Sequence, residues 1–284
     1  MGKFDGILFC SDVDGTLMNG KTPVSEKNIK AIEYFEANGG AFTACTGRHP
    51  RIVSTVLADV TLNAPIMGYN GAIIYDWDIP GEVRVLSLPR SILLDSIKFM
   101  ESDPCIDDMV FSIWSTSVFV GVDRVNGGYV APDGPFDGRH FDTAEEFIEA
   151  FPDEVIYKVL FRLKAGITPE ESERIRDAAI EKFGEHDVTR SWIRGVEINL
   201  RGASKGSASR FIAERMGKKL LVCAGDYEND HSMIKEADIG FVMENGVESL
   251  KEEADVIAPH CGEDGIAWII DYLEKEIDAG RIKL

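Results

Sequence analysis

The stretch DVDGTL at residues 12–17 directly follows the apolar run ILFCS at residues 7–11. The run has the length and composition of a buried β-strand. Asp12 and Asp14 are two residues apart on an extended chain, so their side chains point to the same side. Gly15 then lets the backbone turn away at once. Two carboxylates held together suit a bound divalent cation, or a nucleophile beside an acid/base.

A solvated turn at a strand end is the plainer interpretation of this motif taken alone. An EF-hand is excluded, because its glycine falls further along the loop and a glutamate must close it. The rest of the chain has to decide between the turn and a reactive site.

The composition is that of an ordinary soluble protein: 284 residues, 44% hydrophobic and 28% charged. A formal net charge of -19 argues against binding to nucleic acid or to an anionic membrane, since both require a basic surface. We expect no membrane span, because no apolar run is long enough, and no signal peptide before the first strand. Five scattered cysteines indicate reduced thiols, so we expect a cytoplasmic protein. The oligomeric state stays open, a monomer included.

Strand and helix patterns alternate at both ends of the chain. Strands are predicted at residues 7–11, 41–45, 66–67, 72–75, 220–224, 239–243 and 255–258, and helices near 25–38, 52–58, 204–217 and 266–277. This alternation favours an α/β fold with a doubly wound parallel sheet, formed by residues 1–81 and 191–284. The regular alternation of strand and helix patterns stops between residues 82 and 190. We expect these residues to form an inserted α+β cap domain.

Polar residues follow three of the predicted core strands. Asp12 and Asp14 follow the first, Thr46 the second, and Asp226 the strand at residues 220–224. In a parallel α/β sheet these groups share the carboxyl edge, where ligands bind. Their convergence there is hard to explain as ordinary turn chemistry.

This set of residues suits phosphoryl transfer. Asp12 and Asp226 can hold Mg²⁺, with the backbone carbonyl of Asp14 as a further ligand. Asp12 is then the nucleophile that forms an aspartyl-phosphate. Asp14 can protonate the leaving oxygen and later deprotonate the attacking water. Thr46, the Gly47 amide and Lys205 can hold the phosphoryl oxygens. Without the other motifs, Lys205 would be interpreted as a solvated helix residue.

Four ordered motifs resemble those of the haloacid dehalogenase (HAD) superfamily of aspartate-nucleophile phosphatases. They are residues 12–17, Thr46-Gly47-Arg48, Ser204-Lys205-Gly206, and Gly225-Asp226 followed by Asn229-Asp230 and Met233. The likeness is greatest to the Cof-like branch, whose large α/β cap (type IIB) is inserted between the second and third motifs, and Asn70-Gly71-Ala72 is also typical of that branch.

The resemblance implies a role for each matching residue. Asp12 would be the nucleophile, Asp14 the acid/base and Asp226 a metal ligand. Asn229 would contact phosphate or substrate, as would Asn70. Asp230 would orient Lys205 and metal-bound water. Arg48 fits a phosphate contact and a structural ion pair equally well, and His231 is assigned to the rim of the site.

The leading functional hypothesis is a Mg²⁺-dependent phosphatase of small phosphorylated metabolites, with sugar phosphates as the first class to consider. A phosphomutase of the same superfamily and a phospho-ligand sensor without turnover are the alternatives. The sequence does not name the substrate, and it does not rank Trp114, Arg139 and Lys158 as cap residues that contact the leaving group.

Overall fold

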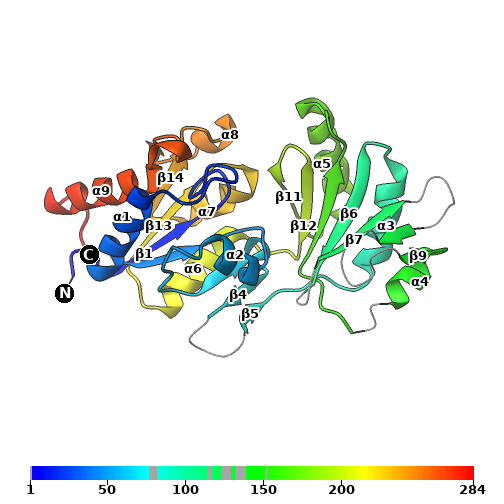
Figure 1. The fold of residues 1–284 in the computed structure, drawn as a ribbon, viewed down its shortest axis with the longest axis horizontal. Helices are drawn as coiled ribbons and strands as arrows, with labels where there is room; N and C mark the ends of the chain where they lie inside the picture. Colours follow the sequence, from blue (N-terminus) through cyan, green and yellow to red (C-terminus); the bar gives the residue numbers. More distant parts are fainter. Residues whose placement is uncertain (1, 77–81, 114–116, 123–128, 132–138, 151–152) are drawn as a thin grey trace. The chain divides into compact units, whose positions relative to one another are not determined.

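The computed structural model describes residues 2–76, 82–113, 117–122, 129–131, 139–150 and 153–284. The chain forms two compact units. Unit 1 consists of Met1–Arg84 and Ser204–Leu284, and unit 2 consists of Val85–Ala203. Unit 2 is therefore an insertion within unit 1, and the colours of Figure 1 show unit 1 built from both ends of the chain.

Unit 1 contains a five-stranded parallel sheet. Its strands, in spatial order, are β15 (Val256–Ala258), β14 (Ile239–Met243), β13 (Leu220–Gly225), β1 (Ile7–Ser11) and β2 (Ala41–Ala44). Its helices are α1 (Glu26–Ala37), α2 (Pro50–Val56), α6 (Lys205–Arg215), α7 (His231–Glu236), α8 (Glu248–Lys251) and α9 (Gly265–Asp278), with 3-10 turns η1 (Tyr69–Gly71), η2 (Glu228–Asp230) and η3 (Cys261–Glu263).

Helices cover both faces of this sheet. Ile7 and Phe9 of β1 belong to one core with residues of α1 and α9. Leu8 and Cys10 belong to a second core with residues of α6 and α7. Successive side chains of a strand point to opposite faces, and a strand buried on both faces is apolar throughout. The expected doubly wound α/β core is therefore confirmed.

The helix boundaries follow from local capping chemistry. Ser25 caps α1, its side chain accepting from the Asn28 N–H group at 3.1 Å. Ser204 caps α6 in a capping box with Ser207, so Lys205 is the first residue of that helix. A smaller sheet of β3 (Ile66–Gly68), β4 (Ile73–Tyr75) and β5 (Glu82–Val85) lies in the first part of the chain.

Unit 2 is built on a seven-stranded sheet whose paired strands are antiparallel. The spatial order is β11 (Asp187–Trp192), β12 (Gly195–Asn199), β10 (Lys158–Leu163), β6 (Ile106–Ser112), β7 (Ser117–Val122), β8 (Tyr129–Ala131) and β9 (Arg139–Phe141). Residues of α3 (Ile92–Ser102), α4 (Ala144–Glu149) and α5 (Pro169–Phe183) join the sheet in one hydrophobic core. The expected α+β character of the insertion is present.

The boundaries of the insertion differ from those expected at 81/82 and 190/191. The structural units meet at 84/85 and 203/204. The second difference has a clear cause: β11 spans the expected boundary, and β12 pairs with β10 over residues 195–199. Both strands are therefore part of the sheet of unit 2, and the chain returns to unit 1 just before α6.

Two expectations from composition can be compared with the structure. All five cysteines are free thiols. Over the ranges that the structure describes, no helix is both long enough and apolar enough to span a bilayer.

Candidate active site

Candidate functional residues of unit 1 follow the carboxyl ends of adjacent strands. In the parallel ladders, Ser11 at the end of β1 pairs with Ala224 of β13 on one side and Ala44 of β2 on the other. Asp12 comes next after β1, and Asp226 next after β13. This edge of the sheet is where α/β folds bind ligands.

Lys205 holds two of the carboxylates in a buried ion-pair network. Its Nζ atom lies 2.6 Å from Oδ1 of Asp12 and 2.6 Å from Oδ1 of Asp230. The Lys205 and Asp230 side chains are 0% exposed and that of Asp12 is 8% exposed. Lys205 is thus not the solvated helix residue that its position alone would allow, and its ammonium group is shared by two acids from different segments.

Asp12, Asp226 and Asp230 form the acidic cluster of the site. One carboxylate oxygen from each lies within 4.8 Å of the others. Oδ2 of Asp230 accepts from the backbone N–H groups of Asp226 (2.9 Å) and Tyr227 (3.1 Å), while its Oδ1 binds Lys205. Both oxygens of Asp230 therefore have protein donors, which fits an orienting role better than that of a principal ligand.

The electrostatics of the cluster suit a divalent cation. Burial raises the pKa of Asp12 to about 7, against the opposing effect of the Lys205 charge. Burial and the negative charges of Asp12 and Asp230 raise the pKa of Asp226 to about 9. Burial disfavours charge on Lys205, but the two aspartates raise its pKa well above the usual value. Three carboxylates against one ammonium leave negative charge that a hard cation with oxygen ligands would neutralise.

Asp14 lies apart from the acidic cluster. Its side chain is 46% exposed and forms a two-point ion pair with Arg48, with Nε–Oδ2 at 2.8 Å and Nη2–Oδ1 at 2.5 Å. Of the two interpretations of Arg48, the ion pair is the one that the structure contains. Among the described residues, the carboxylates grouped as a candidate metal site include Asp230 and not Asp14, so Asp14 could reach the ion only through its backbone carbonyl.

The second motif and the turn η1 are joined by hydrogen bonds. Thr46 Oγ1 accepts from the Arg48 N–H group at 3.2 Å, and the Thr46 carbonyl accepts from the Asn70 N–H group at 2.9 Å. Asn70 has φ 58°, a left-handed conformation that Asn tolerates better than most residues. Asn229 Nδ2 donates to Asn70 Oδ1 at 3.3 Å, so these two predicted substrate residues lie side by side.

A close approach of two backbones fixes this turn against α6. Gly71 has φ +91°, and a Cβ atom there would overlap the carbonyl oxygen of Ser204. Glycine is the residue that permits both the angle and the contact. The turn with Asn70 is thereby held beside the first residue of α6, which is Lys205.

The remaining candidates lie elsewhere. His231 contacts Glu253 (Nδ1–Oε2 2.9 Å) rather than the acidic cluster. In unit 2, Lys158 forms a buried ion pair with Glu197 at 2.6 Å, and the Arg139 guanidinium lies 5.0 Å from the ring centroid of Phe141. Trp114 lies outside the described residues.

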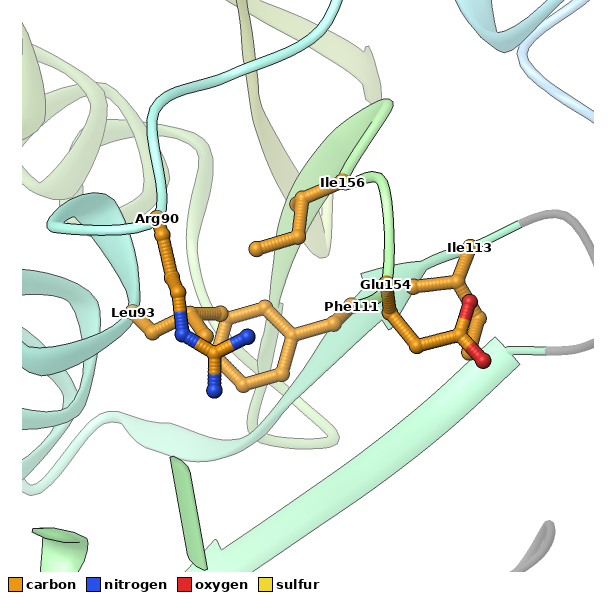
Figure 2. A pocket seen from close by; sticks show the side chains of 6 residues that line it. All are labelled: Arg90, Leu93, Phe111, Ile113, Glu154 and Ile156. Carbon is orange, nitrogen blue, oxygen red and sulfur yellow. The ribbon is translucent and has the colours of Figure 1, made fainter. Parts of the chain in front are cut away.

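A pocket in unit 2 has a lining that suits phosphoryl transfer less well than the acidic cluster does. It holds about 240 Å³ of space, part of it open to solvent, and Figure 2 shows its lining side chains: Arg90, Leu93, Phe111, Ile113, Glu154 and Ile156. Its walls are mostly apolar, and it contains one carboxylate against the three of the acidic cluster.

Sequence reasoning missed Asn245. Its Nδ2 donates to the Gly15 carbonyl at 2.8 Å and its Oδ1 accepts from the Cys261 N–H group at 2.9 Å. One signal was available, because Asn245-Gly246 follows β14, a further strand ending at the same edge of the sheet.

Comparisons with known proteins agree with this geometry. The family model of the haloacid dehalogenase-like hydrolases matches residues 9–270. The 5-amino-6-(5-phospho-D-ribitylamino)uracil phosphatase YcsE of Bacillus subtilis is 28% identical over 270 residues, covering 93% of this chain and 94% of that protein.

Solved structures share the fold along nearly the whole chain. A phosphatase of the haloalkanoate enzyme superfamily from Bacteroides thetaiotaomicron has a TM-score of 0.75 at 20% identity, with 95% of this chain and 96% of that chain covered. A sugar phosphatase of HAD subclass IIB has a TM-score of 0.71 at 20% identity, with 93% and 98% covered. The chain therefore belongs to the haloacid dehalogenase-like hydrolases, and the prediction of a HAD-superfamily phosphatase is confirmed at that level.

Proposed function

We propose that the chain is a Mg²⁺-dependent phosphatase that hydrolyses small phosphorylated metabolites through an aspartyl-phosphate on Asp12. The observation that supports this most directly is the buried arrangement of Asp12, Lys205 and Asp230, with Asp226 beside it. Relatives named as phosphatases, including YcsE, lend support to the reaction class.

In the first step a carboxylate oxygen of Asp12 attacks phosphorus, and the bond from phosphorus to the leaving oxygen breaks. Lys205 binds Oδ1 of Asp12, so its positive charge favours the ionised form of the acid and opposes the effect of burial. The other oxygen is available for attack. Asp14, on the exposed side of the same loop, gives its proton to the leaving alkoxide.

In the second step water attacks the phosphorus of the aspartyl-phosphate. Asp14 takes the proton from this water, the bond between Asp12 and phosphorus breaks, and inorganic phosphate leaves. Arg48, paired with Asp14 through two hydrogen bonds, holds the Asp14 carboxylate in place for this step. Thr46, Gly47, Asn70 and Asn229 are the proposed contacts of phosphate and substrate.

Asp12 and Asp226, with the Asp14 carbonyl, would hold the Mg²⁺ ion. When bound, the ion supplies positive charge that offsets repulsion between the carboxylates and a phosphate dianion. Asp230 orients Lys205 and the backbone at Asp226 through the contacts described above.

Phosphate release from a panel of phosphorylated metabolites tests this function, with catalytic amounts of protein and Mg²⁺. We expect multiple turnovers on at least one sugar phosphate or related small phosphate ester, and none with Asp12→Asn. Stoichiometric binding without phosphate release would indicate a sensor. Conversion of a sugar phosphate to its isomer would indicate a phosphomutase.

A further inference from the structure

The loop that follows β14 contacts both sides of the acidic cluster. The Asn245 side chain donates to the Gly15 carbonyl (2.8 Å) in the loop after Asp14. The Val247 N–H group, two residues later, donates to the Asp226 carbonyl (2.9 Å). One short segment is thus hydrogen-bonded to both chain segments that carry the proposed ligands.

The Gly15 peptide is a point of close approach to Asp226. Gly15 has φ +90°, and a Cβ atom there would overlap the Asp226 carboxylate. The next residue, Thr16, donates its hydroxyl to Asp226 Oδ1 at 3.1 Å. Asn245 binds the carbonyl of the peptide between Gly15 and Thr16, so its amide is one of the contacts that hold this hydroxyl beside Asp226.

The Asn245 side chain also contacts a third segment of the chain. Its Oδ1 accepts from the Cys261 N–H group (2.9 Å) at the start of η3. With both ends of the amide bonded to backbone, the side chain has one defined orientation. A flexible surface residue could not fix the separation of two loops in this way.

We propose that Asn245 is a positioning residue for the metal site: it sets the separation between the Asp14–Thr16 loop and Asp226, and so favours a small ion with strict geometry. The proposal rests on the proposed function. Asn245 itself is bonded to backbone groups and is not proposed to touch the ion or the substrate. Mg²⁺ requires nearly ideal octahedral geometry at short distances, whereas Ca²⁺ accepts longer distances and irregular shells. Loosening the loop should therefore weaken Mg²⁺ binding more than Ca²⁺ binding.

The test compares Asn245→Ala with Asn63→Ala. Asn63 is a matched control because its side chain makes the same pair of backbone contacts: Nδ2 to the Gly40 carbonyl (3.0 Å) and Oδ1 from the Phe42 N–H group (2.7 Å). Asn63 lies between α2 and β3, and its contacts are with the start of β2, at the opposite end of that strand from Thr46. Binding of Mg²⁺ and of Ca²⁺ alone is measured by calorimetry, and by the rise in Tm with each ion.

Partners that orient metal ligands typically contribute 10–100-fold to metal affinity. We expect Asn245→Ala to raise the Kd for Mg²⁺ by about tenfold or more, with a smaller change for Ca²⁺. Asn63→Ala should lower Tm without changing either Kd. If Asn245→Ala does not fold, Asn245→Ser, which keeps a shorter donor, should give a Mg²⁺ effect in the same direction.

Two results would overturn the inference. An unchanged Mg²⁺ Kd in the folded Asn245 variant, with a wild type that binds Mg²⁺, removes the positioning role and leaves the proposed function intact. A wild type that binds no Mg²⁺ overturns both the inference and the metal dependence of the proposed function.

Discussion

Replacing Lys205 with methionine should be strongly destabilising, because two buried carboxylates lose their shared counter-ion. Methionine keeps much of the side-chain volume and removes the charge. The Nζ atom is 2.6 Å from an oxygen of Asp12 and 2.6 Å from one of Asp230, with no exposure of the lysine side chain. Removing one partner of a buried ion pair costs about 3–5 kcal/mol, so we expect the free energy of unfolding at pH 8 to fall by about that amount.

The loss of stability in Lys205→Met should decrease as the pH is lowered. The pKa of Asp12 is already raised to about 7 by burial while the Lys205 charge lowers it. Without that charge it rises further. A carboxyl whose folded pKa lies above its unfolded value costs stability when ionised, and the cost disappears as pH falls toward the unfolded value. The deficit of Lys205→Met should therefore be smaller at pH 5 than at pH 8.

Urea unfolding of single and double variants measures these effects. Adding Asp230→Asn to Lys205→Met removes one uncompensated charge and should restore part of the lost stability. Lys158→Met is the matched control, because Lys158 forms a buried pair with Glu197 at the same 2.6 Å, and Asp230→Asn should not rescue it. A Lys205→Met protein within about 1 kcal/mol of the wild type at pH 8 would refute this account of the network.

Three further predictions concern metal, packing and a half-buried acid. EDTA should abolish turnover and Mg²⁺ should restore it, whereas full turnover in EDTA would exclude Asp226 as an essential metal ligand. Gly15→Ala should abolish the rise in Tm with Mg²⁺, since the new Cβ displaces the Asp226 carboxylate; an unchanged rise would contradict this close approach. Burial raises the pKa of Glu36 to about 7, and its Oε1 has no hydrogen-bond partner within the described ranges. Ionisation of Glu36 in the folded state therefore costs stability at high pH. Glu36→Gln should raise Tm at pH 8 and leave it nearly unchanged at pH 4. An equal change in Tm at both pH values would contradict the raised pKa of Glu36.

The parts of the site that the sequence predicted are those set by local rules. Asp12 and Asp226 follow apolar runs, and parallel strands place their carboxyl ends at one edge. The start of a helix near residue 204 was predicted from the sequence, and the structure shows Ser204 as its cap. These inferences needed only the direction of the strands and the ends of the helices.

The parts that the sequence did not predict depend on contacts between distant segments. The Arg48–Asp14 ion pair joins residues 34 positions apart, and nothing local distinguishes it from a phosphate contact. The contact of Asn245 with Gly15 spans 230 positions. The cap boundary was misplaced for the same reason, because β12 belongs to unit 2 through its pairing with β10.

In the proposed reaction Asp12 receives the phosphoryl group and Asp14 transfers protons. Asp14→Asn keeps the nucleophile but lacks the base for the attacking water, so hydrolysis of the aspartyl-phosphate should slow. The variant is mixed with Mg²⁺ and an activated aryl phosphate, whose leaving group needs little protonation, and is then examined by intact-protein mass spectrometry. We expect a gain of one phosphoryl group in Asp14→Asn and none in Asp12→Asn. Phosphorylation of the Asp12→Asn protein would contradict these roles.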